Sequence, residues 1–378
     1  MQKKNNSPAR ESLEQNLEAI SDNSDGLTRR SFVGVLAAGA AAGMGILATS
    51  CSSTTSAATE KKATEPVPEP VVMDAKYTIV DNHVHLMDFL QKTDGVEALV
   101  EKMDEAGVSQ AVLFGMAMAK QWDEDSDNQP SYYLSNDSRT YYYSATDYLM
   151  MERLQAASPE HRARFLPFVC GINPNDRFAA EHIRQALDLY PNQFAGIGEL
   201  MSRHDDLTAL TYGEPPHLDH PAFLEVFDLA AEEGLPVLIH HNISGSYMDD
   251  PIYLEELKAG LAHNRETKII WAHVGISRRI EISNLIEITD SLLKENANLW
   301  IDLSWVVFDD YISKDMNAWA ELIESHPDRF MIGSDCVGHW EKYAPTIQRY
   351  YDLVDLLSPE AATKLCYENI LSIVKRYQ

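Results

Sequence analysis

Eight apolar, β-rich runs alternate with segments of helical periodicity from Lys76 to the end of the chain. Runs such as Gln110-Ala111-Val112-Leu113-Phe114 are almost continuously apolar, as expected for parallel strands that are covered on both faces. The intervening segments carry apolar residues three and four positions apart, which predicts amphipathic helices. Eight strands, each followed by a helix, within about 300 residues predict a (β/α)8 or TIM barrel.

The boundaries of these segments carry recognisable signals. Gly107 and Gly234 follow helical segments, where glycine commonly ends a helix, and the prolines after Ser158 and Ser358 mark helix starts. An open doubly wound sheet is the alternative, but no Gly-rich phosphate loop follows the first strand. The expected strands are 77–83, 109–115, 165–171, 194–198, 236–240, 268–273, 298–303 and 329–334. The expected helices are 95–106, 144–157, 177–190, 221–233, 252–263, 279–295, 315–325 and 341–357, with an extra C-terminal helix, 359–377, outside the barrel.

Two histidines end the first predicted strand, in the stretch Asp81-Asn82-His83-Val84-His85. Alternate residues of a strand point to the same face, so His83 and His85 are expected to project together. Such a pair can hold a divalent metal ion, but it can equally be two polar residues in a turn. Other strand ends have to decide between these interpretations.

Four other strand ends also carry polar residues. Glu199 follows the fourth strand, His240 the fifth, His273 the sixth and Asp335 the eighth. The carboxyl ends of barrel strands form the face on which active sites lie. Unpaired polar groups buried there would cost several kcal/mol, which makes core packing a poor explanation. The pattern therefore predicts one site built from many strand ends.

In this order, the segments resemble the amidohydrolase superfamily, and specifically its amidohydrolase-2 branch. That branch includes aminocarboxymuconate-semialdehyde decarboxylase, related aromatic-acid decarboxylases and dicarboxylate lactonases. The resemblance spans the whole predicted barrel. The matching segments are Asp81-Asn82-His83-Val84-His85, Gly196-Ile197-Gly198-Glu199, Pro236-Val237-Leu238-Ile239-His240, Ala272-His273-Val274-Gly275, Gly333-Ser334-Asp335 and Glu368-Asn369-Ile370-Leu371.

The resemblance implies that one catalytic ion, most often zinc, is held by four ligands: His83, His85, His240 and Asp335. Asp335 would also act as general base, and His273 would bind a second metal or manage the metal-bound water. His241, next to His240, is expected to face the other way.

No lysine ends the fourth strand, so the carboxylated-lysine bridge of the binuclear branch is not expected. Glu199 stands at that position. It could bind a second ion, support a ligand from behind or bond to a loop, and these alternatives stay open. One ion is favoured over two.

Substrate contacts are expected in the loops that follow the strands. The candidates are Arg203, Trp305 and His339, and the same loops also hold His204, Asn242, Arg278 and Arg279. An arginine there could hold a substrate carboxylate through two parallel hydrogen bonds. The loop from Met116 to Ser144 is rich in aromatic residues, which either wall a pocket or pack the loop onto the barrel.

The start of the chain reads as an export signal. Thr28-Arg29-Arg30-Ser31-Phe32 precedes an apolar run from Val35 to Ala48, an order that resembles a twin-arginine signal. The run is short for a membrane-spanning helix, which needs about 20 apolar residues, although a plain anchor is the alternative. Ala48-Thr49-Ser50-Cys51 resembles a lipoprotein box, with Ala where Leu is usual. It predicts lipidation of Cys51, and cleavage near Ala57 is the alternative.

These signals divide the chain into a signal with a lipobox at 1–51, a flexible linker at 52–75 and the barrel at 76–378. Serine, threonine, alanine and then spaced prolines make the linker's composition typical of an extended, solvated tether. The formal charge of −27 argues against a nucleic-acid partner, because such binding is driven by Lys and Arg.

The sequence thus predicts a lipid-anchored, metal-dependent hydrolase in the periplasm or cell envelope, exported by the twin-arginine translocase. A metal-bound hydroxide would attack the carbonyl carbon of a small ester, lactone or amide. The alternative within enzymes is non-oxidative decarboxylation of a small, for example aromatic, carboxylic acid. A non-catalytic ligand-binding lipoprotein is the alternative from another class, and a homodimer is left open.

Overall fold

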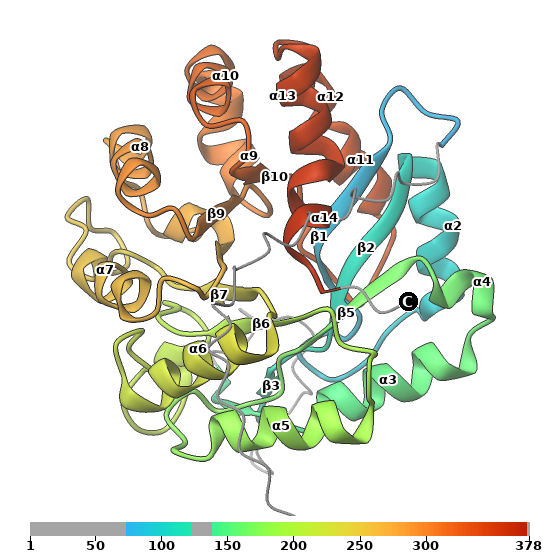
Figure 1. Ribbon diagram of the computed structural model, residues 1–378, viewed down its shortest axis with the longest axis vertical. Helices are drawn as coiled ribbons and strands as arrows, with labels where there is room; N and C mark the ends of the chain where they lie inside the picture. Colours follow the sequence, from blue (N-terminus) through green and yellow to red (C-terminus); the bar gives the residue numbers. More distant parts are fainter. Residues whose placement is uncertain (1–72, 123–137, 376–378) are drawn as a thin grey trace, which may run out of the picture. The chain divides into compact units, whose positions relative to one another are not determined.

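The computed structural model describes residues 73–122 and 138–375, which form the predicted (β/α)8 barrel (Figure 1). A nine-stranded sheet runs in the order β10-β9-β8-β7-β6-β5-β2-β1-β11, and all its pairs are parallel. The strands are β1 (Ile79–His85), β2 (Val108–Phe114), β5 (Phe165–Val169), β6 (Gly196–Met201), β7 (Val237–His240), β8 (Ile269–Trp271), β9 (Leu299–Asp302), β10 (Phe330–Met331) and β11 (Cys336–Val337).

The eighth strand closes the barrel in two pieces, although the sequence predicted one strand at 329–334. β10 pairs with β9, and β11 pairs with β1 at the other end of the sheet order. Between the two pieces, the Ser334 N–H donates to Asp81 Oδ1 instead of a strand partner, and Asp335 has φ 52°. Asp335 N–H still donates to the His83 carbonyl at 2.8 Å, so the sheet is continuous around the barrel.

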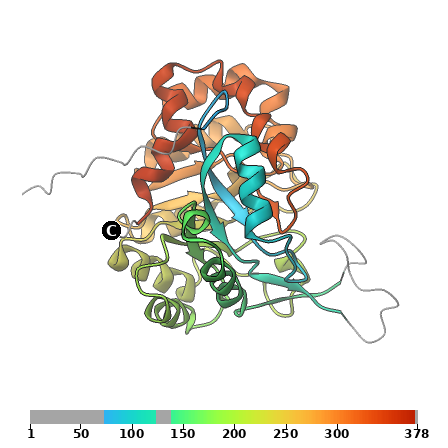
Figure 2. The same cartoon turned by 90° about the vertical axis from the view of Figure 1, so that its right-hand side faces the viewer.

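Helices surround the sheet in Figure 1, and Figure 2 shows α2 lying over β1 and β2. The larger helices are α2 (Val96–Ala106), α3 (Thr146–Ala156), α5 (Ala179–Leu189), α6 (Pro221–Glu233), α7 (Leu254–His263), α8 (Leu285–Glu295), α10 (Met316–Ser325) and α11 (Tyr343–Gln348). Short elements are β3 (Met118–Lys120), β4 (Thr140–Tyr142), α4 (Pro159–Arg162), α9 (Val307–Asp310), α12 (Tyr351–Val354), α13 (Pro359–Thr363), α14 (Asn369–Ile373), the 3₁₀ turns η2 (Thr208–Leu210), η3 (Ala272–Gly275) and η4 (Ile312–Lys314), and the π-helical η5 (Lys364–Glu368).

The predicted boundary signals act as expected. Gly107 and Gly234 take left-handed conformations, φ 74° and φ 67°, and end α2 and α6, where their N–H groups donate to carbonyls of the last turn. The hydroxyl of Ser158 accepts the His161 N–H at the start of α4, and Ser358 does the same for Ala361 at the start of α13.

The predicted helix 279–295 was too long, because α8 begins only at Leu285. Arg279 is drawn away from a helical turn: its Nε donates to Asp205 Oδ2 at 2.9 Å and its Nη2 to the Asp205 carbonyl at 2.9 Å. The Ser283 N–H donates to Asp249 Oδ1 at 2.7 Å. Tertiary hydrogen bonds therefore override the helical periodicity of this segment.

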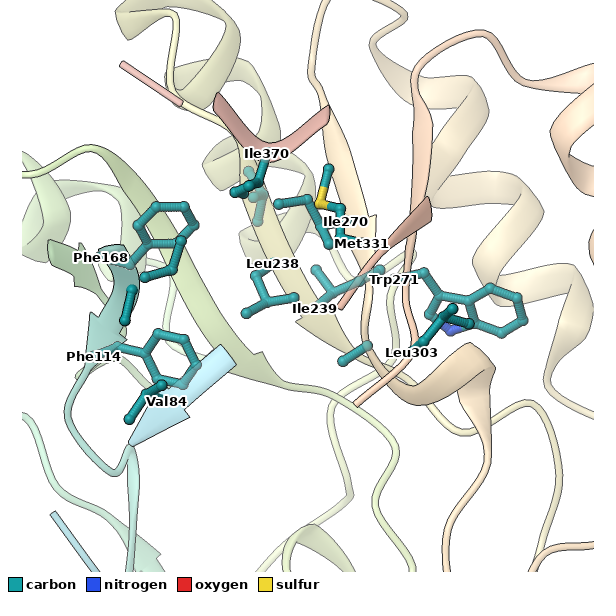
Figure 3. Packing of buried hydrophobic residues seen from close by; sticks show 14 of the residues in the cluster. Val84, Phe114, Phe168, Leu238, Ile239, Ile270, Trp271, Leu303, Met331 and Ile370 are labelled. Carbon is teal, nitrogen blue, oxygen red and sulfur yellow. The ribbon is translucent and has the colours of Figure 1, made fainter. Parts of the chain in front are cut away.

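The last helical segment covers the amino-terminal end of the barrel and ends earlier than predicted. Asn369 Nδ2 donates to the Phe330 carbonyl, where β10 begins, and Lys375 N–H donates to the Ala195 carbonyl, just before β6. Ile370 is 1% exposed and joins the apolar core. Figure 3 shows that core from close by, with labelled side chains from β1, β2, β5, β7, β8, β10 and α14 that include Val84, Phe114, Phe168, Leu238, Ile270, Met331 and Ile370.

The predicted export signal, Cys51 and the linker up to residue 72 lie outside the described residues. Within residues 73–122 and 138–375, the structure has no helix whose length and apolar character would let it cross a membrane.

Candidate metal centre and active-site cavity

His83 and His85 lie at the carboxyl end of β1 and are buried together. Their Nε2 atoms are 3.4 Å apart, and both rings pack edge-on against Phe114, at centroid distances of 5.0 and 4.6 Å. His85 Nδ1 donates to the Gly115 carbonyl at 2.8 Å, since a carbonyl can only accept. His85 Nε2 therefore carries the lone pair in the neutral ring, and it faces the interior of the site.

Two carboxylates meet these histidines from other strands. Asp335 Oδ1 lies 3.4 Å from the Nε2 atoms of both His83 and His85. Glu199 Oε2, at the carboxyl end of β6, lies 3.3 Å from His85 Nε2 and 3.6 Å from His83 Nε2. Four strand-end atoms from three different parts of the chain thus converge on one point.

The spacing of these four atoms fits one small divalent ion. Ligand atoms about 2.1 Å from an ion in a tetrahedron lie about 3.4 Å from one another. The two histidine nitrogens lie 3.4 Å from each other and 3.3 to 3.6 Å from the two carboxylate oxygens, which matches that edge length. Two imidazole nitrogens and two carboxylate oxygens are also ligands that zinc accepts. The donor set therefore fits such an ion in both chemistry and spacing.

The electrostatics of the site keep its carboxylates ionised. Burial opposes ionisation of Glu199, but the imidazoles of His83, His240 and His273 hold its pKa well below the ordinary value. Burial likewise opposes ionisation of Asp335, and His83 together with His85 lowers its pKa. In return, and against burial, Glu199 and Asp335 raise the pKa of His83. The carboxylates and the protonated rings thus stabilise one another, and a divalent cation that displaced the ring protons would take over this role.

His240 and His273 contact the other oxygen of Glu199. Oε1 lies 3.1 Å from His240 Nδ1 and 3.4 Å from His273 Nε2. His240 Nε2 is engaged by Asn242 Oδ1 at 2.9 Å. Among the described residues, three clusters have metal-binding spacing. Two lie in this site, His83 with His85 and Asp335, and His83 with Glu199 and His273, and the third is the more exposed group of His217, Asp219 and Glu256. His240, which the family resemblance implied to be a ligand, belongs to none of these clusters. Its ring contacts Glu199 Oε1 instead.

His241 faces away from this site, as expected for the neighbour of His240. Its Nε2 donates to the Tyr253 carbonyl at 3.1 Å, and its Nδ1 lies 3.0 Å from the Ser202 hydroxyl. Burial lowers its pKa to about 4. The ring is therefore a neutral part of the packing behind the site.

Backbone strain is concentrated around the site. His273, Val274, Trp305 and Asp335 have φ between 52° and 57°, in the left-handed region that residues with a Cβ rarely adopt. Such conformations cost roughly 1–3 kcal/mol each and cluster at functional sites. Three of the four residues line the same cavity. The fold therefore holds these side chains in place against a local energetic preference.

A cavity of about 300 Å³ opens beside the cluster, a volume at the small end of ligand sites. Predicted contacts Trp305 and His339 line it, and Trp305 packs on His273 at 5.1 Å. His339 sits at the rim, 55% exposed, between Asp94 and Asp88. The other lining residues are His85, Asp88, Phe89, Leu90, Met116, Lys120, Glu199, Met201, His204, Leu207, His240, His273, Arg278, Asp335 and Val337.

The structure does not bring Arg203 to this cavity. Its guanidinium makes two hydrogen bonds to Glu256, at 2.7 and 3.1 Å, and stacks over Tyr253. Among the described aromatic residues of the loop after β2, Trp122 and Tyr141 are exposed and none lines the cavity. Tyr132 and Tyr133 lie outside the described residues.

Sequence reasoning missed Lys120 and Asp302, whereas His204 was among the residues considered after the fourth strand. Lys120 is buried at the cavity wall on β3, in a loop where only aromatics attracted notice. His204 stacks on His240 at 4.3 Å, and burial followed by His240 lowers its pKa to about 3. Asp302 contacts His83 from β9. A charged residue in an otherwise apolar strand was the signal available for Asp302.

Comparison with known proteins gives a family and a fold. A family model described as Amidohydrolase matches residues 80–375. The chain is similar to a protein described as probable 2-pyrone-4,6-dicarboxylic acid hydrolase from Acinetobacter baumannii, solved with citric acid bound. That pair shares 14% identity with a TM-score of 0.52, over 79% of this chain and 99% of the other. It is also similar to an amidohydrolase from Burkholderia multivorans with bound zinc, at 13% identity, TM-score 0.52, over 79% and 99%.

A 2,6-dihydroxybenzoate decarboxylase from Rhizobium aligns at 14% identity with a TM-score of 0.45, over 78% of this chain and 98% of the other. A search of curated protein sequences found no match. The two structures with a TM-score of 0.52 support the barrel fold, and the family model spans nearly all of it.

Replacing His241 by Gln is expected to flatten the dependence of stability on pH. In the folded protein the pKa of His241 is about 4, against 6.5 ordinarily. Above pH 6.5 the ring is neutral in both the folded and the unfolded chain, so its burial costs no stability through titration there. As pH falls from 6.5 to 4, the unfolded chain takes up the proton and up to about 3 kcal/mol is lost. Denaturant unfolding with a chelator should therefore show a smaller loss for His241→Gln over this range. His263→Gln, at the surface, is the matched control. Parallel profiles for His241→Gln and the wild type would contradict the assignment.

Proposed function

This chain belongs to the amidohydrolase family, and we propose that it is a metal-dependent hydrolase of a small carboxylate-bearing ester, lactone or amide. One observation carries the proposal. His83 Nε2 and His85 Nε2 lie 3.4 Å apart, and each lies 3.3 to 3.6 Å from Asp335 Oδ1 and Glu199 Oε2, beside a small cavity. A binding protein without catalysis would not need proton-carrying side chains on strained backbone next to a metal centre.

Zinc is the proposed ion, with His83, His85, Asp335 and Glu199 as its ligands. The zinc in the Burkholderia multivorans amidohydrolase supports this choice. A bound ion of this kind lowers the pKa of a coordinated water towards ~7 and polarises a carbonyl group. Glu199 Oε1 is engaged by His240 and His273, which favours one ion over two.

Asp335 and His273 are the proposed proton carriers. Neighbouring imidazoles lower the pKa of Asp335 against the effect of burial, so its carboxylate is available to accept a proton from the attacking water. His273 Nε2 lies 3.8 Å from Asp335 Oδ2 and lines the cavity, where it can deliver a proton to the leaving group.

The cavity wall favours an anionic substrate, despite the acidic surface of the protein. Lys120, Arg278 and His339 all line it, and hydrogen bonds first to Asp94 and then to Asp88 raise the pKa of His339. Phe89 and Trp305 provide flat apolar walls beside these groups. The similarity to a probable dicarboxylic acid hydrolase is consistent with a carboxylate-bearing substrate.

Replacing His273 by Ala should lower kcat about 10²–10⁴-fold, the usual contribution of a proton-transferring side chain. Zinc content, measured by plasma emission spectrometry, should stay near one ion per chain because His273 is outside the proposed ligand set. The substrates are a panel of lactones, esters and aromatic carboxylic acids, and His263→Ala is the control. Metal-free wild-type protein, an active His273→Ala variant, or release of CO₂ in place of hydrolysis would each contradict the proposal.

Lys120→Met should raise KM for carboxylate-bearing substrates about 10–100-fold, since a hydrogen bond to a charged group contributes about 1.5–3 kcal/mol. KM for a neutral ester of the same skeleton should change little. The surface variant Lys258→Met provides the matched loss of charge. An equal change of KM for both substrates would show that Lys120 does not recognise the carboxylate.

We further propose that the chain is exported by the twin-arginine translocase and anchored through a lipid on Cys51. Arg29 and Arg30 precede an apolar run that ends at Ala48, and Cys51 follows three residues later, which supports this proposal. Changing both arginines to lysine keeps the charge and should leave the protein in the cytoplasm, as judged by cell fractionation. Undiminished export of this variant would refute the twin-arginine assignment, while Cys51→Ala separately tests the anchor.

A further inference from the structure

We propose that Asp302 and Ser304 are positioning residues that fix the proton positions on His83 and His273, so that both Nε2 atoms present lone pairs to the site. Both residues lie at the carboxyl end of β9, and neither was expected to have a role. The inference rests on the proposed metal-dependent function and extends it to residues that touch neither the ion nor the cavity.

Asp302 is fully buried and surrounded by donors. Its Oδ1 accepts the Ser304 N–H at 2.8 Å and the Asn82 side-chain amide at 3.3 Å. Its Oδ2 lies 2.7 Å from His83 Nδ1 and 2.6 Å from the Ser304 hydroxyl. Four donors satisfy this carboxylate in its ionised form, which is what a buried charge requires.

The directions of these hydrogen bonds follow from the chemistry of the groups. An ionised carboxylate only accepts, so His83 Nδ1 carries a proton and the Ser304 hydroxyl donates to Oδ2. A hydroxyl has one proton, so Ser304 Oγ must accept from its other neighbour, His273 Nδ1, at 2.8 Å. One carboxylate therefore places a proton on Nδ1 of both histidines, directly for His83 and through Ser304 for His273.

The consequence appears at the other side of each ring. With Nδ1 protonated, the neutral rings have their lone pairs on Nε2. His83 Nε2 then faces the cluster as a ligand atom, 3.4 Å from Asp335 Oδ1. His273 Nε2 faces Glu199 Oε1 at 3.4 Å, and a proton taken up there while Ser304 holds Nδ1 is hydrogen-bonded to this carboxylate. Partners of this kind orient ligands and typically change metal affinity 10–100-fold.

Gly333, on the neighbouring strand segment, leaves the space that the side chains of Asp302 and Ser304 occupy. Asp302 and Ser304 are two residues apart and lie next to the final barrel strand. A Cβ on Gly333 would come within 2.8 Å of Ser304 Cβ and 2.9 Å of Asp302 Oδ1. The glycine of the Gly333-Ser334-Asp335 segment is therefore required by the close approach of these two side chains.

The direct test is the proton position on each histidine ring, measured by long-range ¹H–¹⁵N NMR on the metal-free protein. In the wild type, Nδ1 of both His83 and His273 should be protonated. Ser304→Ala should move the His273 proton to Nε2, where Glu199 accepts it, and leave His83 unchanged. Asp302→Asn should shift His83 to the Nε2–H form. An unprotonated Nδ1 on either wild-type ring would overturn the inference.

Zinc affinity and steady-state kinetics test its consequence. Asp302→Asn should weaken zinc binding about 10–100-fold in a chelator competition, because His83 loses its ligand form. Ser304→Ala should keep zinc affinity within about threefold and lower kcat at least about tenfold with little change in KM. Asp147→Asn and Ser109→Ala are matched controls, since each makes the same chemical change at a buried, hydrogen-bonded side chain outside the site.

The outcomes separate the two proposals. A wild type that binds zinc and turns over substrate, with both variants behaving like their controls, would overturn this inference and leave the proposed function standing. A wild type without zinc or turnover would overturn the proposed function. The proton positions on the metal-free rings would still decide the roles of Asp302 and Ser304.

Discussion

Buried negative charge is the constraint on which this structure depends. Glu199, Asp335 and Asp302 lie inside the barrel, and removing a carboxylate from water costs several kcal/mol unless charge and hydrogen bonds compensate. Asp302 is compensated by four donors. Against the effect of burial, Glu199 and Asp335 raise the pKa of His83 and His85, so protons on these rings balance part of the negative charge. A divalent ion at the shared point would supply the missing positive charge, and would explain why four ligand-type atoms are held together there.

The barrel supplies the rigidity that such a cluster needs. Each ligand comes from a different strand end, except for the pair on β1, so the closed sheet fixes their mutual distances. Left-handed backbone at His273, Trp305 and Asp335 persists because the surrounding packing holds it. The cavity then combines this centre with cationic and apolar walls, although the whole chain is strongly acidic. The charge of the cavity wall thus depends on its own side chains and not on the net charge of the chain.

The sequence predicted the barrel and the strand-end residues well because both follow from simple periodicity. His83 and His85 are two apart on one strand, and the glycines after α2 and α6 end helices through their own backbone freedom. The rest depends on tertiary contacts that no local pattern encodes. The side chain of Arg203 bonds to Glu256 and that of Arg279 to Asp205. The ring of His240 contacts Glu199 and Asn242. Asp302 and Ser304 matter only because β9 lies beside His83 and His273, which are far away in sequence.

The central claim is that one ion is held by side chains of three barrel strands. Anomalous diffraction at the zinc edge, on crystals of the purified protein, tests it most directly. The account predicts one strong peak about 2.0–2.2 Å from His83 Nε2, His85 Nε2 and one oxygen each of Asp335 and Glu199. His240 should remain outside the coordination sphere. A peak bonded to His240 instead of Glu199, or no peak at this cluster in zinc-supplemented crystals, would contradict the account.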